Sequence, residues 1–322
     1  MAPLPRGPGH LPRRGGTMTP LVRIGTRGSQ LALWQANHVA ELLRRVTGAA
    51  TELVVVRTAG DADRSRALHQ MPGSGFFTRE LQLALQRGEV DLVVHSLKDL
   101  PLDEPPGLAV VAVLAREEPR EVLLAPQGAR GQGGLGLKPG AVVGTSSLRR
   151  AAQALACQPD IVIKPLRGNV PTRLRRLDEG AVDALLLAYA GVVRLGCDLN
   201  GRLARLFDPD EFVPAPGQGA LAVEARLDGG VAARLAARLD DPEAAAATAC
   251  ERHLLRRLGG GCHLPLGAHA VRQADGFRLV AALGEVDAEV TRASVRRVTV
   301  VGSDPASTAE AAWRALGGTG PS

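Results

Sequence analysis

Short apolar runs that alternate with helical patterns constrain the fold of this chain more than any other feature of its sequence. The candidate strands are Val22–Gly25, Glu52–Arg57, Val90–Val94, Ala109–Leu114, Val122–Ala125, Ala141–Gly144, Asp160–Ile163, Val182–Ala188 and Ala220–Glu224. The candidate helices are Gln30–Val46, Thr78–Arg87, Ser147–Cys157, Val170–Leu177 and Pro242–Leu258. Alternation at this spacing is typical of βαβ crossovers, and it predicts an α/β fold built in layers.

Caps and turns mark the ends of several predicted helices. Ser29 can cap the helix that starts at Gln30, and Asp241 before Pro242 predicts a cap followed by proline at the first helical position. Gly88 predicts the end of the helix from Thr78, because glycine accepts a positive φ at little cost.

Two further segments are distinct in composition. Segment 126–140 is rich in glycine, and we expect a surface loop there. After about residue 240 an alanine-rich helix is followed by strand-like Phe277–Leu283 and Val298–Val301 and by a last helix at Ala306–Leu316. This order predicts a small α+β domain. No internal sequence repeat is evident.

Composition weakens one class of function. The 322 residues are 45% hydrophobic and 22% charged, which is typical of a globular chain long enough for two or three domains. The formal charge of +6 suggests a nucleic-acid binder, but half of the excess comes from arginines among the first twenty residues. Aromatic residues make up only 2% of the chain, so few side chains can stack on bases. We therefore expect no nucleic-acid partner.

The N-terminal segment and the cysteines bear on location. Residues 1–19 lack the apolar stretch of a secretory signal, so we expect a disordered tail, with either Met1 or Met18 as the true start. No stretch of about 18 uncharged apolar residues exists, and we expect no membrane span. The four cysteines form neither a CxxC pair nor a zinc-spaced cluster with histidine, which favours the reducing cytoplasm and no metal site.

Basic and hydroxyl side chains gather directly after four predicted strands. The motifs are Gly25–Ser29, His95–Pro101, Gly144–Arg150 and Leu166–Arg173. Open α/β sheets bind ligands at the carboxyl ends of their strands, where free N–H groups, hydroxyls and arginines favour anions. Each motif alone is explained by helix capping and solvated surface charge. Their repetition predicts an extended ligand with several negative charges.

Asp99 and Cys262 are the two candidate chemical groups among these motifs. Asp99 is an acid within a basic set, and beside Lys98 it can stay ionised and stabilise a cation or move a proton. Its alternative role is a turn residue before Pro101. Cys262 follows three glycines after the helical pattern Thr248–Leu258, which predicts a loop thiol with room for an attached group. A structural free cysteine is the alternative.

The ordered motifs resemble the hydroxymethylbilane synthase family, also called the porphobilinogen deaminases. The resemblance runs from about Arg23 to Gly267 and rests on seven motifs: Arg23–Arg27, Leu31–Gln35, His95–Asp99, Gly144–Arg150, Leu166–Asn169, Pro216–Ala220 and Gly260–Cys262. It implies an enzyme that joins four porphobilinogen units head to tail, releases four ammonia molecules and then frees hydroxymethylbilane with water. It also implies a dipyrromethane cofactor held by a thioether to Cys262.

The resemblance further implies an α/β fold with two periplasmic-binding-protein-like domains, each a mixed sheet flanked by helices, and a small α+β C-terminal domain. Carried onto this chain, the first domain covers residues 20–115 and 218–237. The second covers 116–217, and the third covers 238–322 and carries the cysteine. Family members are usually monomers, and porphobilinogen is the implied small-molecule partner.

Site residues follow from the resemblance. Each porphobilinogen ring carries an acetate and a propionate, so the growing chain is a polyanion, and Asp99 matches the family's catalytic carboxylate. The implied cofactor and substrate contacts are Arg27, Ser29, Phe77, Ser96, Lys98, Thr145, Ser147, Arg149, Arg150, Arg167, Arg173 and Arg194. The loop Leu68–Phe77 is the expected lid, but Gln70 and Ser74 stand where many members carry lysine.

A non-catalytic anion-binding protein of periplasmic-binding-like fold is the main alternative. Such a protein would share the arginines at the strand ends, but it would need neither Asp99 nor Cys262. Its export would also require a signal that the N-terminal segment does not show.

Overall fold

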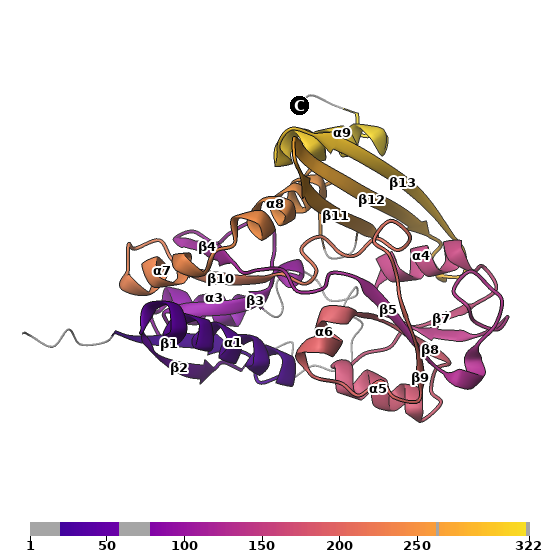
Figure 1. Ribbon diagram of the computed structural model, residues 1–322, viewed down its shortest axis with the longest axis horizontal. Coiled ribbons are helices and arrows are strands. Elements are labelled where there is room, and N and C mark those ends of the chain that lie inside the picture. The colour runs from indigo at the N-terminus through magenta and orange to yellow at the C-terminus, as the bar shows by residue number, and fades with distance from the viewer. Residues whose placement is uncertain (1–19, 58–77, 262–263, 320–322) are drawn as a thin grey trace, which may run out of the picture.

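Three β-sheets organise this protein. The computed structural model describes residues 20–57, 78–261 and 264–319. Within that part of the chain, two five-stranded sheets lie side by side, and a three-stranded sheet with its helices covers one end of the pair (Figure 1). The α/β class with two mixed sheets and a small α+β C-terminal unit is therefore confirmed.

The first sheet has the strand order β2-β1-β3-β10-β4. Its strands are β1 (Leu21–Thr26), β2 (Ala50–Val55), β3 (Leu92–Ser96), β4 (Leu108–Val113) and β10 (Leu221–Arg226). β1 pairs in parallel with β2 and β3, whereas β10 runs antiparallel between β3 and β4. The helices of this unit are α1 (Gln30–Thr47), α3 (Arg79–Gln86) and α7 (Val231–Ala236).

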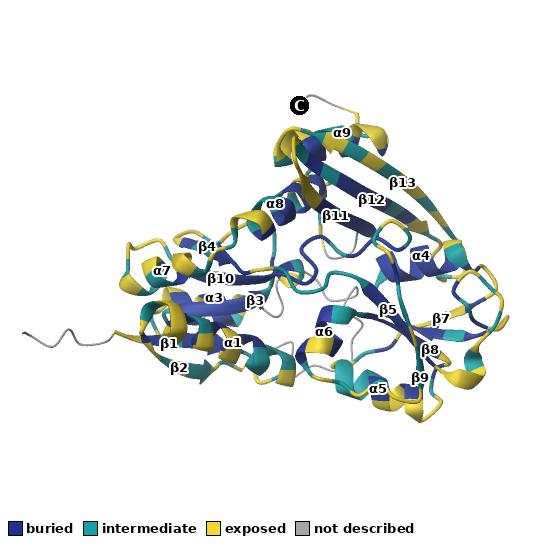
Figure 2. Ribbon diagram, in the orientation of Figure 1, coloured by how far each residue is buried: buried dark blue, intermediate teal, exposed yellow. Residues whose placement is uncertain are grey.

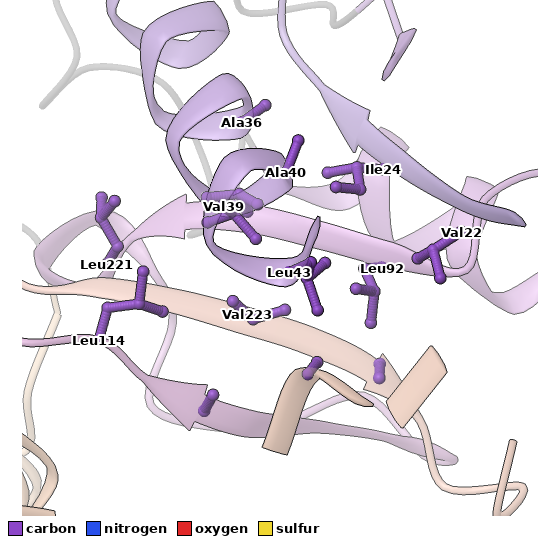
Figure 3. Close-up of a cluster of buried hydrophobic side chains, with 14 of the residues drawn as sticks. Val22, Ile24, Ala36, Val39, Ala40, Leu43, Leu92, Leu114, Leu221 and Val223 are labelled. Carbon is purple, nitrogen blue, oxygen red and sulfur yellow. The ribbon is translucent and has the colours of Figure 1, made fainter. Parts of the chain in front are cut away.

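The core of the first sheet lies between α1 and the strands. Val39 and Leu43 of α1 are fully buried and point at Ile24, Leu92 and Val223 on three neighbouring strands (Figure 3). Burying a side chain of this size contributes about 1.5–3 kcal/mol. The apolar face of α1 therefore fixes the helix on the sheet, and Ser29 at its start caps it as predicted.

The second sheet repeats this arrangement in the order β7-β6-β8-β5-β9. Its strands are β5 (Glu121–Pro126), β6 (Val142–Gly144), β7 (Val162–Lys164), β8 (Ala184–Ala188) and β9 (Arg202–Leu206). β6 is parallel to β7 and β8, and β5 runs antiparallel between β8 and β9. The helices are α4 (Leu148–Cys157), α5 (Val170–Asp178) and α6 (Tyr189–Arg194).

The chain crosses between the two sheets twice. The first crossover, residues 114–120, leads from β4 to β5, and the second, residues 207–220, leads from β9 back to β10. Each sheet therefore receives its antiparallel inner strand by way of a crossover. Both crossovers run between the two sheets (Figure 1).

The C-terminal unit combines two helices with three antiparallel strands. Its elements are α8 (Pro242–Arg257), β11 (Leu266–Gln273), β12 (Gly276–Val286), β13 (Ala293–Gly302) and α9 (Pro305–Ala315). The short turn η4 (Ala237–Leu239), which precedes α8, packs on the first sheet unit instead. Leu254 of α8, Leu279 of β12 and Trp313 of α9 meet in its buried core. The predicted cap Asp241 accepts a hydrogen bond from the Ala244 N–H. Figure 2 shows no buried residue along β13, whereas α9 carries buried residues on one side and exposed residues on the other.

The structure adds elements that the periodicity did not indicate. β9, β11, α6 and α7 were not predicted. β9 has the sequence Arg-Leu-Ala-Arg-Leu, which does not show the hydrophobic pattern of a strand. Its pairing with β5 and the ion pair from Arg202 to Asp178 stabilise it instead. Segment 126–140 contains η3 (Gln127–Ala129), but it is not simply a surface loop. Leu135 and Leu137 are buried in the core of the second sheet unit, where Gln158 bonds their backbone groups.

Glu251 of α8 joins the C-terminal unit to both crossovers. Its carboxylate accepts hydrogen bonds from Arg116 Nη1 and Nη2 at 2.7 and 3.1 Å, and Arg116 lies in the first crossover. It also accepts from the Gly217 N–H of the second crossover at 2.6 Å and from the Ala270 N–H of β11 at 2.8 Å. Every one of these groups loses its partner if the carboxylate is removed.

We predict that Glu251→Ala lowers the free energy of unfolding by about 3–5 kcal/mol, because the largely buried charge of Arg116 would lose the carboxylate that neutralises it. Urea unfolding followed by circular dichroism measures this change. Glu179→Ala is the matched control, since Glu179 pairs with Arg175 on the exposed surface of α5. The control should change stability by less than about 0.5 kcal/mol. Equal losses in the two variants would contradict the prediction.

Candidate functional site

Four loops carry the predicted site residues, and each follows a parallel strand. Arg27 lies between β1 and α1, and the turn η2 (Leu97–Asp99) follows β3 directly. Thr145 lies between β6 and α4, and Arg167 lies between β7 and α5. The prediction that these motifs occupy strand ends is confirmed, and two loops come from each of the five-stranded sheets.

A buried carboxylate, Glu121, lies at the centre of the site. Its side chain is fully buried at the start of β5. It accepts hydrogen bonds from Arg149 Nη2 at 2.6 Å, from Arg150 Nε at 2.9 Å and from Gln218 Nε2 at 3.1 Å. Gln218 Oε1 in turn accepts a hydrogen bond from Lys98 Nζ at 3.4 Å. We call these five residues the Glu121 cluster.

The electrostatics of the Glu121 cluster are dominated by its cations. Burial alone would raise the pKa of Glu121, but Arg150, Arg149 and Lys98 lower it to about 2. Burial lowers the pKa of Lys98 to about 8, with Arg150 and Arg149 acting in the same direction and Asp99 and Glu121 opposing them. The concentrated positive charge thus disfavours the protonated form of Lys98. This property is expected of a site that binds anions.

Asp99 lies in η2, directly after β3 of the first sheet. Its side chain is exposed and forms no hydrogen bond with any other described residue. Its charge nevertheless acts on Lys98 and on Arg173 of α5. Burial, together with Arg150, lowers the pKa of Arg173 to about 10, and Asp99 opposes that shift. Asp99, Lys98, Arg150 and Arg173 are therefore brought together from both sheets.

The predicted hydroxyl groups all have partners inside the protein. Ser29 Oγ accepts from the Ala32 N–H at 3.3 Å, and Ser147 Oγ accepts from the Arg150 N–H at 3.4 Å. Thr145 Oγ1 accepts from the Ser147 N–H at 3.2 Å, and Ser96 Oγ accepts from Gln35 Nε2 at 2.8 Å. The capping role that the sequence left open is thus present at Ser29 and Ser147. Each hydroxyl can still donate to a ligand oxygen.

Arg194 lies apart from the Glu121 cluster and joins the two sheet units. It extends from α6, donates from Nη2 to the Gly219 carbonyl at 2.6 Å and lies 5.6 Å from the centroid of the Trp34 ring on α1. Burial lowers its pKa to about 10. Its buried Nε has no hydrogen-bond partner among the described residues. The structure therefore places this predicted contact residue at the junction between α1 and α6.

The remaining predicted residues either are partly exposed or lie outside the described residues. Arg27 and Arg167 are partly exposed on their loops. Phe77, Cys262 and the lid loop with Gln70 and Ser74 lie outside the described residues. Gly259 just after α8 has φ +73°, which confirms that a glycine ends the helix before Cys262.

Sequence reasoning missed two members of the cluster as functional residues. Glu121 opens an otherwise apolar strand, and a lone acid at such a position was the available signal. Gln218 belongs to a motif of the resemblance, but its bridging position between Lys98 and Glu121 depends on the second crossover. Neither contact can be inferred from spacing, because the partners lie 28 to 120 residues apart.

Neither a metal-binding cluster nor a membrane-spanning helix occurs in the described part of the chain. No group of three or more His, Cys, Asp or Glu side chains there could hold a metal ion. Among the same residues, no helix combines the length and apolar character needed to cross a membrane.

We predict that Lys98 titrates near pH 8 in the Cys262→Ser variant, which lacks the thiol expected to hold the cofactor. The ammonium should lose its proton as the pH rises through that value. Lys98 is one of only three lysines, so ¹³C-methylated lysine NMR can follow it. Glu121→Gln should lower the midpoint further, because the carboxylate stabilises the ammonium. The signal of the exposed Lys138 is the internal control for the Glu121→Gln substitution, because Lys138 lies outside the Glu121 cluster. A wild-type midpoint above about 10 would contradict the prediction.

Comparisons with known proteins agree on one family. Residues 22–233 match the family model described as porphobilinogen deaminase, dipyromethane cofactor binding domain, and residues 245–312 match that of the porphobilinogen deaminase C-terminal domain. The porphobilinogen deaminase of Trichlorobacter lovleyi is 44% identical over 271 residues, covering 84% of this chain and 85% of that protein. That of Acidothermus cellulolyticus is 46% identical over 283 residues, covering 87% and 83%.

Likeness to solved structures is weaker. An ancestral arginine-binding protein bound to arginine superposes with a TM-score of 0.41 at 13% identity, covering 68% of this chain and 90% of that one. At this level the likeness carries no weight for function, and the fold rests on the sheet topology above. The two family models and the sequence identity over most of the chain are decisive instead. This chain belongs to the porphobilinogen deaminase family.

Proposed function

We propose that the residues at the strand ends of the two sheets perform the family reaction. In this reaction four porphobilinogen molecules are condensed head to tail with release of ammonia, and hydrolysis then releases hydroxymethylbilane. The observation that carries this proposal is the excess of cations where the strand ends meet. Lys98, Arg149, Arg150 and Arg173 surround the acids Glu121 and Asp99. A growing chain with two carboxylates on every ring requires such a site.

The residues present fit the dipyrromethane cofactor of the family. Arg150 uses only its Nε for Glu121, and its Nη1 and Nη2 have no hydrogen bond to another described residue. Lys98, Thr145 and Ser147 lie in the same cluster of loops and offer further donors. When bound, the cofactor supplies the pyrrole carbon to which the first substrate unit is joined. We propose that Cys262 holds it through a thioether.

Arg149 has a different part in this proposal. Its Nη1 donates to the Val213 carbonyl at 2.9 Å and its Nη2 to Glu121. Since both terminal nitrogens already have protein partners, Arg149 contributes mainly charge to the cofactor carboxylates. Arg27, Ser29, Arg167, Arg173 and Arg194, with Phe77 and Ser96, are proposed to contact the cofactor or the substrate.

Asp99 is the proposed catalytic residue. Its carboxylate has no hydrogen bond to a described residue, so its oxygens are available to a pyrrole N–H. Loss of ammonia from porphobilinogen leaves a cation, and a fixed carboxylate stabilises that cation more than the neutral substrate. The same group can accept the proton that leaves when the new bond has formed. Arg173 opposite Asp99 can hold a substrate carboxylate while this happens.

The wider setting is proposed in the same way. Residues 20–115 with 218–237, residues 116–217 and residues 238–322 form three domains. The enzyme acts as a cytoplasmic monomer with porphobilinogen as its partner and binds neither nucleic acid nor membrane. The separate core clusters under each sheet support the domain boundaries.

We predict that the purified protein carries a covalent adduct of two pyrrole units on Cys262. Intact mass spectrometry and peptide mapping measure the mass and place it. Cys262→Ser should lack the added mass, whereas Cys250→Ser should retain it, because Cys250 is buried and burial raises the pKa of its thiol to about 12. Active wild-type protein of unmodified mass would refute the cofactor assignment.

We predict that Asp99→Asn retains the adduct but loses turnover of porphobilinogen by at least about a hundredfold, because an amide cannot stabilise the developing cation. Ammonia release and product formation measure the rate. Asp103→Asn is the matched control, since Asp103 lies four residues along the same segment with a fully exposed side chain. Near-normal turnover by Asp99→Asn would remove Asp99 from the mechanism.

A further inference from the structure

Arg252 of α8 binds the turn that carries Asp99. Its Nη1 donates to the Leu97 carbonyl at 3.4 Å and to the Leu100 carbonyl at 3.1 Å, and its Nη2 donates to the Pro101 carbonyl at 2.8 Å. The side chain is partly buried against the turn. A guanidinium is suited to this task, because it presents several donors in a rigid plane.

The turn has its other restraints at its two ends and through Lys98: the Leu97 N–H donates to the Ala220 carbonyl at 3.0 Å, and Lys98 Nζ donates to Gln218 Oε1 at 3.4 Å. η2 is a single 3₁₀ turn closed by the hydrogen bond from the Leu100 N–H to the Leu97 carbonyl at 3.2 Å. The buried side chains of Leu97 and Leu100 pack beside Ala244 of α8. Asp99, between these two leucines, makes no side-chain hydrogen bond within the described residues. The backbone of the turn therefore sets the position of its carboxylate.

The helix that supplies Arg252 is itself fixed. The neighbouring residue Glu251 is tied to both crossovers and to β11, as described above. α8 ends at Arg257, and the glycine loop that leads to Cys262 follows at once. One helix thus contacts the Asp99 turn and begins the loop with the proposed attachment cysteine.

We propose that Arg252 is a positioning residue, which holds the Leu97–Pro101 turn against α8 so that Asp99 keeps its place at the end of β3. This inference rests on the proposed role of Asp99. Removal of the guanidinium would leave three carbonyls of the turn without this donor. The turn could then shift, and a displacement of about 1 Å at a catalytic group can cost on the order of a hundredfold in rate.

The test compares Arg252→Gln and Arg252→Lys with Arg256→Gln in protein shown by intact mass to carry the cofactor. Arg256 is the matched control: it lies one turn along α8, is exposed and donates to the single carbonyl of Leu102 at 2.6 Å. We expect Arg252→Gln to lower kcat by about tenfold to a hundredfold with KM for porphobilinogen changed by less than about twofold. Arg252→Lys should retain an intermediate kcat, because one ammonium cannot span three carbonyls.

Hydrogen exchange of the peptide containing Lys98, Asp99 and Leu100 gives a second readout. We expect its amides to exchange about tenfold faster in Arg252→Gln and to be unchanged in Arg256→Gln. A normal kcat in Arg252→Gln would overturn the inference, and so would a lowered kcat with unchanged exchange. Failure of the proposed function would give a different result. Turnover by Asp99→Asn would then be near normal, whatever the Arg252 variants show.

Discussion

The buried charge of Glu121 is the constraint on which the site depends. A carboxylate removed from water costs several kcal/mol unless cations and donors surround it. Arg149, Arg150 and Gln218 meet this requirement and, in doing so, hold the start of α4 and the second crossover against β5. The cations that we propose to bind the ligand are consequently held in place by the protein itself. A ligand with several carboxylates then meets donors that need little reorganisation.

Buried glutamates recur at the other junctions of the molecule. Glu251 joins α8 to the two crossovers, and Glu224 on β10 lies 2.9 Å from His95 Nε2 and accepts from Gln82 Nε2 at the same distance. His95 is the residue before Ser96 in the motif that ends with Asp99. The Asp99 turn is therefore supported beneath by β10 and, on the side of α8, by Arg252. Rigid support of this kind would keep the proposed catalytic carboxylate of Asp99 in place without direct contacts to its oxygens.

The two five-stranded sheets have equivalent topologies although the sequence shows no internal repeat. In both, two parallel strands flank the strand that leads into a capped helix, and the inner antiparallel strand follows a crossover. This equivalence directs two sets of strand ends toward one space. Arg194 bridges the units near the second crossover, through Gly219 and the Trp34 ring. The crossovers are thus both covalent links and part of the site wall.

The sequence alone determined the α/β class, most strands and helices, the helix caps at Ser29 and Asp241, and the strand-end location of the four basic motifs. These features depend on local periodicity and capping chemistry, which are determined by residues close together in the sequence. The structure alone decided that Glu121 pairs with Arg149 and Arg150, that Leu135 and Leu137 are core residues, that Arg194 lies at the junction of the sheets, and that Arg252 donates hydrogen bonds to the Asp99 turn. Those contacts join residues far apart in the chain, and their free energy arises from burial and charge pairing that only the packed molecule creates.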